Sequence, residues 1–60
     1  MKMFSITYAI RITAEKVVEV ALNRKFRTLN EAIKEAKGNQ LAEAYRIFDK
    51  EGYRVYSEKR

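Results

Sequence analysis

The chain has 60 residues and a formal net charge of +5, and 47% of its residues are hydrophobic. This length allows a single domain, residues 1–60, with a marginal core. Cysteine is absent, which excludes disulfides. Histidine is absent too, so a zinc site would need carboxylates alone, and no metal site is predicted. No cofactor is predicted either. The longest nearly apolar stretch, residues 17–22, is too short to cross a membrane. The first residues do not form a signal peptide, and the sequence therefore predicts a cytoplasmic protein.

The first predicted element is a β-strand over residues 3–12. Apolar and polar residues alternate through it, and β-branched and aromatic residues at a period of two are typical of a half-buried strand. Its apolar face consists of Phe4, Ile6, Tyr8, Ile10 and Ile12.

Residues 14–27 allow two interpretations. Valine occupies three of the four positions 17–20, which favours a strand because β-branched side chains fit a pleated sheet. An apolar helical stripe capped by Thr13 fits the same residues, so the choice stays open at this point.

A helix is predicted over residues 28–38. Thr28 and Glu31 have the spacing of a capping box, in which the threonine hydroxyl accepts from the Glu31 amide and the glutamate returns to the Thr28 amide. Gly38 stands where helices commonly end in a left-handed residue. One side of the helix carries the apolar stripe Leu29, Ala32, Ile33 and Ala36.

Residues 45–57 are predicted to form a β-hairpin. Two aromatic-rich arms, 45–48 and 53–56, flank the sequence Asp-Lys-Glu-Gly. Asp49 in the first position and Gly52 in the last suit a type I turn that a left-handed glycine closes.

These elements predict a small two-layer α+β domain of order ββαββ, in which one helix covers one face of an antiparallel sheet. The alternative is a β-α-α order followed by the hairpin or a third helix. One or both of Tyr45 and Tyr53 are expected in the core or at its rim. The predicted core consists of Phe4, Ile6, Tyr8, Ile10, Val18, Val20, Leu22, Leu29, Ile33, Ala36, Ile47 and Val55.

The alternative order resembles the ribbon-helix-helix family of DNA-binding proteins. Residues 8–13 resemble the ribbon, 14–25 the first helix and 28–33 the start of the second. The resemblance implies a dimer whose paired ribbons insert Arg11 and Thr13 into the major groove. Phe26 occupies the place where the family usually has a glycine, and the C-terminal hairpin has no counterpart.

Two further resemblances imply less about the function of the protein. Residues 25–37 with 45–56 resemble a strand–helix–hairpin arrangement of small bacterial and phage domains, which implies no function. Residues 43–52 resemble the entry helix and loop start of a calmodulin-type EF-hand, and this resemblance implies a helix over residues 40–48 as the alternative to the first arm of the hairpin. A calcium loop is excluded, because Tyr53, Arg54 and Arg60 occupy the positions that need an oxygen ligand, a glycine and a bidentate glutamate.

The sequence offers no catalytic residues. Asp49 is the only aspartate, and the serines and threonines have no evident activating base. Glu31 and Glu35 fall on the exposed side of the predicted helix, where capping and solvation explain them. The sequence therefore predicts a protein that is not an enzyme.

The basic residues point to a non-enzymatic binding module. They concentrate in the strand segments, most densely at residues 24–27. In the ββαββ order, the sheet face away from the helix carries cations and aromatic side chains, which together bind unpaired bases and phosphates. The alternative is a solvated face whose arginine stems cover the sheet. The candidate residues for binding single-stranded nucleic acid or RNA are Arg11, Arg24, Lys25, Arg27, Arg46, Phe48, Arg54 and Tyr56.

A second function class fits the same sequence. A small regulator or inhibitor, of the kind that phages and mobile elements encode, binds another protein through an exposed strand edge or through an apolar patch that includes Phe48 and Tyr56. The net charge of +5 also suits an acidic protein as the partner. A homodimer is consistent with so small a core.

Overall fold

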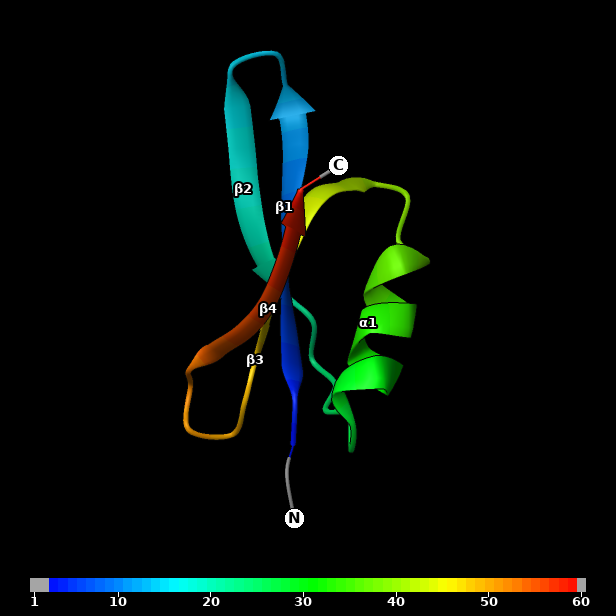
Figure 1. Ribbon diagram of the computed structural model, residues 1–60. Coiled ribbons are helices and arrows are strands. Elements are labelled where there is room, and N and C mark those ends of the chain that lie inside the picture. Colours follow the sequence, from blue (N-terminus) through cyan, green and yellow to red (C-terminus); the bar gives the residue numbers. More distant parts are fainter. Residues whose placement is uncertain (1–2, 60) are drawn as a thin grey trace.

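The computed structural model describes residues 3–59 and has the predicted ββαββ order (Figure 1). Four antiparallel strands form one sheet in the order β2-β1-β3-β4, and one helix lies against one face. The elements are β1 (Ser5–Thr13), β2 (Lys16–Ala21), α1 (Leu29–Lys37), β3 (Ala42–Phe48) and β4 (Arg54–Lys59). The ribbon-helix-helix order is therefore wrong, because β2 replaces its first helix.

The structure confirms the predicted ends of α1 only in part. The Thr28 hydroxyl accepts a hydrogen bond from the Glu31 amide at 3.1 Å, as the capping box requires. The Glu31 carboxylate, however, accepts from the Thr28 hydroxyl at 3.2 Å instead of from the Thr28 amide. The left-handed prediction for Gly38 is wrong: its φ is −76°, and its amide still bonds to the Lys34 and Glu35 carbonyls as a continuing helix would.

The turn between β3 and β4 forms as predicted. The Asp49 carbonyl accepts from the Gly52 amide at 3.0 Å, and Gly52 has a φ of 91°. The Asp49 carboxylate also accepts from the Glu51 and Tyr53 amides at 3.0 and 2.9 Å. These bonds explain why aspartate begins the turn and why glycine ends it.

The core lies between α1 and the two central strands, β1 and β3. Tyr8 and Tyr45 are both buried, whereas Tyr53 is exposed. Among residues 3–59, nine side chains are buried: Phe4, Ile6, Tyr8, Phe26, Ala32, Ala36, Ala42, Tyr45 and Ile47. The partly buried Ile10, Leu22, Leu29, Ile33 and Tyr56 pack against them.

Two core predictions are wrong, and register and strand position explain both. A register shift in β4 pairs Ile47 with Tyr56 and Phe48 with Arg54, so Val55 is left without a partner and Tyr56 takes the inner position instead. Val20 lies opposite Tyr8 but on the edge strand β2, where it is 45% exposed. The sequence pattern also missed Phe26, which bridges to Phe4 after β2 has ended.

The helix leaves part of the sheet uncovered. It packs against β1 and β3, while the β1–β2 hairpin extends beyond the rest of the molecule (Figure 1). The overall shape is elongated, with principal extents of 40 × 20 × 18 Å. Within residues 3–59, no helix has the length and apolar character that a membrane crossing needs.

Candidate protein-binding edge

The outer face of the sheet, which is the face opposite α1, carries Arg11 and Arg46, and both are neutralised. Arg11 makes a two-pronged ion pair with Glu43, with Nε–Oε1 and Nη2–Oε2 distances of 3.0 and 3.1 Å. Its remaining Nη1 donates to the Ala14 carbonyl at 2.9 Å. Such fork geometry satisfies most of the guanidinium donors that a phosphate would otherwise accept from.

Arg46 is paired in a similar way across a neighbouring strand. Its guanidinium donates to the Glu19 carboxylate of β2. Arg46 lies opposite Thr7, and Glu19 lies opposite Ala9, so the ion pair crosses β1 over two small side chains. Arg11 and Arg46 are therefore both bound to carboxylates within the protein.

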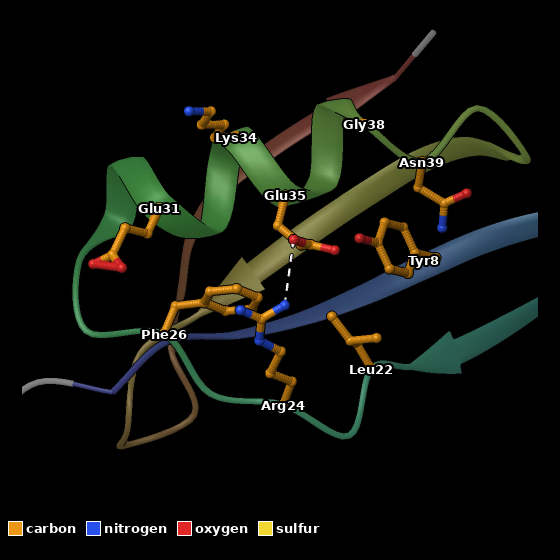
Figure 2. Close-up of a pocket in the computed structure, with 9 residues that line it drawn as sticks. All are labelled: Tyr8, Leu22, Arg24, Phe26, Glu31, Lys34, Glu35, Gly38 and Asn39. Atoms are coloured by element: carbon orange, nitrogen blue, oxygen red, sulfur yellow. Dashed lines mark hydrogen bonds and ion pairs between the residues drawn. The ribbon is translucent and has the colours of Figure 1, made fainter.

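Arg24 lies on the opposite side, against the helix. Its guanidinium carbon is 4.9 Å from the centre of the Phe26 ring, and its Nη1 is 3.5 Å from the Glu35 carboxylate (Figure 2). Phe26 lies on one side of this pair and Tyr8 and Leu22 lie on the other, and all three line an open groove of about 610 Å³ beside α1. The Arg24–Glu35 pair crosses this groove. The walls of the groove carry both positive and negative side chains, so the groove does not favour either an anionic or a cationic ligand.

Tyr56 also lies on the helix side instead of on the outer face. Its ring stacks on that of Tyr45, with centroids 6.1 Å apart and ring planes 26° from parallel. The two hydroxyls donate to the same Glu58 oxygen, at 2.8 Å from Tyr45 and 3.0 Å from Tyr56. Burial, together with the hydrogen bond to Glu58 and its negative charge, raises the pKa of Tyr45.

The other four candidate residues lie toward the end of the sheet where β1 begins. Lys25 and Arg27 flank Phe26, which bridges to Phe4, while Phe48 lies opposite both Ser5 and Arg54. Lys25, Arg27 and Arg54 are exposed, and Phe48 is half-buried. By register, Phe48 and Arg54 share the outer face with Ser5, as predicted. The outer face thus holds four of the eight predicted nucleic-acid ligands, which are Arg11, Arg46, Phe48 and Arg54, and the other four lie elsewhere.

The open edge of β2 is a candidate binding surface, and the sequence analysis named a strand edge of this kind without saying which strand forms it. β2 pairs with β1 on one side. The Leu22 amide bonds to the Ile6 carbonyl, and because bonding alternates along an antiparallel strand, the backbone groups of Val17, Glu19 and Ala21 point outward. The edge therefore offers a row of free donors and acceptors to an added strand.

Both faces of the sheet carry valine side chains at this edge, beside the charged Lys16 and Glu19. Val17 lies opposite Arg11 on the outer face and is 41% exposed. Val18 and Val20 lie opposite Ile10 and Tyr8 on the helix side, beyond the strands on which α1 packs. The other open edge, β4, carries three ionised residues, Arg54, Glu58 and Lys59, against Lys16 and Glu19 in β2, and such charges protect an edge from added strands.

The signal for this edge is present in the sequence as the valine-rich segment 17–20 without proline or glycine. The sequence does not show that β2 lies at the edge of the sheet. Comparisons of the chain with models of protein families, with curated proteins and with solved structures find no match.

Proposed function

We propose that this protein is a non-enzymatic binding module that takes up an extended segment of another protein as an added strand at β2. The observation that carries this proposal is the edge position of β2, which has no second neighbour among the described strands and presents valine side chains on both faces of the sheet. In strand addition, main-chain hydrogen bonds supply affinity and alternate side chains supply specificity. Val17, Val18 and Val20 are the side chains available for that contact.

Strand addition is favoured over binding of nucleic acid to the outer face. A phosphate at Arg11 or Arg46 has to displace Glu43 or Glu19. A strand at β2 displaces nothing within the described residues, because the outward groups of Val17, Glu19 and Ala21 are not used in the pairing with β1. The regulator or inhibitor class is therefore the better supported of the two.

A short synthetic peptide that alternates valine and threonine tests the edge directly. Titrated into isotope-labelled protein, it is expected to shift the amide resonances of Val17, Glu19 and Ala21 most, because those amides gain hydrogen bonds. The measurement is a set of two-dimensional nuclear magnetic resonance spectra recorded at a low protein concentration.

A matched pair of variants controls this titration. Val17 in β2 and Val55 in β4 are each 41% exposed. Val17→Lys is expected to weaken peptide binding by about tenfold or more, and Val55→Lys is expected to leave it unchanged. Shifts centred on β4 or on the outer face, or equal effects of the two variants, contradict the proposal.

Nucleic-acid binding is the second candidate, at a place away from the paired Arg11 and Arg46. Lys25, Arg27, Lys50 and Arg54 lie toward the end of the sheet where β1 begins, and we call them the basic end. They form no ion pair with residues 3–59. The acidic Asp49 and Glu51 of the adjacent turn reduce the local excess of positive charge, which is why this candidate ranks second.

Anisotropy of labelled single-stranded DNA and RNA checks this second candidate. If the basic end binds phosphates, the double variant Lys25→Glu/Arg27→Glu loses affinity, and the wild-type affinity falls steeply with added salt. The control is Lys34→Glu/Lys59→Glu, which changes the net charge equally at other places. Equal losses in both double variants show that net charge alone attracts the nucleic acid.

A further inference from the structure

The outer face changes character at the end where β1 begins, because the cations there form no ion pair with residues 3–59. Phe48 of β3 lies opposite Ser5 of β1 on one side and opposite Arg54 of β4 on the other. Residues opposite each other share a face, so these three side chains form a line across the sheet, which we call the outer row. The helix α1 packs against the other face (Figure 1) and leaves the outer row uncovered.

Lys25 flanks the outer row from the segment that follows β2. Arg24 and Phe26 both lie on the helix side, where the Arg24 guanidinium contacts the Phe26 ring. Side chains alternate along an extended segment, so the side chain of Lys25, between these two, is directed away from the helix. The bridge between Phe26 and Phe4 places Lys25 beside Ser5, at one end of the outer row.

Phe48 therefore has a cation on each side. Its ring is half-buried, and among the described residues the one cation–ring contact is that of Arg24 with Phe26, so no guanidinium stacks on Phe48. Lys25 and Arg54 lie three inter-strand spacings apart, which is about 14 Å. An aromatic ring stacks on an unpaired base, and cations on both sides of the ring hold the phosphates that flank that base.

We propose that the outer row is a stacking site for an unpaired base of a single-stranded nucleic acid, whose chain crosses the strands from Lys25 to Arg54. This inference goes beyond strand addition at β2 and rests on the second candidate function, whose phosphate contacts it shares. Duplex nucleic acid fits less well, because its bases stack on each other and cannot lie on Phe48. The Asp49 carboxylate accepts from two amides of its own turn and forms no ion pair with Arg54.

A tryptophan at position 48 reports stacking directly, because the chain has no tryptophan of its own. In Phe48→Trp, a short oligothymidylate is expected to quench the indole fluorescence, since the indole stacks on a base. An abasic oligomer of the same length and a duplex offer phosphates without an unpaired base, and neither is expected to quench. Ile12→Trp is the control, because Ile12 is 59% exposed and lies at the other end of β1. Its fluorescence is expected to stay unchanged with all three.

Anisotropy of labelled oligomers measures what the base adds to binding. The wild type is expected to bind oligothymidylate about tenfold or more tightly than the abasic oligomer. Phe48→Leu removes the ring and keeps an apolar side chain, so it is expected to lose about tenfold for oligothymidylate and nothing for the abasic oligomer. Phe48→Tyr keeps the ring and is expected to bind as the wild type does. Circular dichroism reports whether each variant is folded.

The salt dependence of binding tests the cation at one end of the outer row. Arg54 and Lys59 are both exposed and lie at opposite ends of β4. Arg54→Gln is expected to reduce the slope of log affinity against log salt by about 0.7, the value for one phosphate contact on a single strand. Lys59→Gln is expected to leave the slope unchanged. Equal slopes for the two variants contradict the part assigned to Arg54.

The outcomes separate the stacking site from the second candidate function. If Lys25→Glu/Arg27→Glu loses affinity while the abasic oligomer binds as tightly as oligothymidylate, the basic end binds phosphates and the stacking site is wrong. Equal quenching of Phe48→Trp and Ile12→Trp, or unchanged affinity in Phe48→Leu, also overturns the stacking site. If no oligomer binds, the stacking site and the second candidate function both fall, whereas strand addition at β2 depends on the peptide titration alone.

Discussion

Replacing Ile6 with alanine is expected to cost about 2–5 kcal/mol of stability. Ile6 has no exposed surface, lies opposite Ile47 and accepts the backbone hydrogen bond from Leu22. Removing its outer carbons leaves a cavity between α1 and the two central strands. A domain of 60 residues typically has about 3–9 kcal/mol of total stability, so this one change is expected to populate the unfolded chain strongly.

The same strand provides the control for this prediction. Ile12 also lies in β1 but is 59% exposed, so Ile12→Ala is expected to change stability by no more than about 0.5 kcal/mol. Urea unfolding, followed by circular dichroism at one low protein concentration, measures both variants. Similar losses for Ile6→Ala and Ile12→Ala contradict the placement of the core.

Replacing Glu58 with alanine is expected to cost about 1–3 kcal/mol, because it leaves two tyrosine hydroxyls without their acceptor. Tyr45 and Tyr56 donate to the same carboxylate oxygen, and Tyr45 is buried. Glutamine keeps one such oxygen, so Glu58→Gln is expected to cost less than about 1 kcal/mol. Thermal or urea unfolding compares the two variants, and equal losses show that the shared oxygen is not what stabilises the pair.

Alkaline pH gives an independent readout of the same cluster. Burial, followed by the hydrogen bond and charge of Glu58, raises the pKa of Tyr45 in the folded protein. Stability from this neutral hydroxyl is therefore complete below the ordinary tyrosine pKa and is lost as pH rises above about 10. Tyr45→Phe is expected to lose stability less steeply than the wild type over that range. Parallel curves for the two proteins contradict this cause.

The position of α1 determines both which side chains form the core and which strand edge stays exposed. The helix packs on β1 and β3, so residues of these strands such as Ile6 and Ile47 are fully buried while Val17 and Val20 of β2 are not. A small domain with a marginal core gains stability from any partner that binds the folded form. Occupation of the β2 edge is therefore expected to raise the stability of the domain.

The amino-acid sequence by itself determines β1, the start of α1 and the turn between β3 and β4, and it favours a strand at β2 without deciding it. The alternation in β1, the bond between Thr28 and the Glu31 amide, and the Asp49–Gly52 turn all depend on neighbours within a few residues. Backbone preferences and side-chain-to-backbone hydrogen bonds act over that range, so they can be predicted without knowing the sheet. The valines that favoured a strand at β2 belong to the same class of local evidence.

The tertiary structure alone decides what those elements present to a partner. Arg11 meets Glu43 across 32 residues and Arg46 meets Glu19 across 27, and no local pattern indicates these pairs. A register shift turns Tyr56 inward and leaves Val55 unpaired, while the position of α1 leaves Val20 exposed. Exposure and ion pairing depend on which strands become neighbours and on where the helix lies, because a side chain's surroundings come mainly from residues distant in the chain.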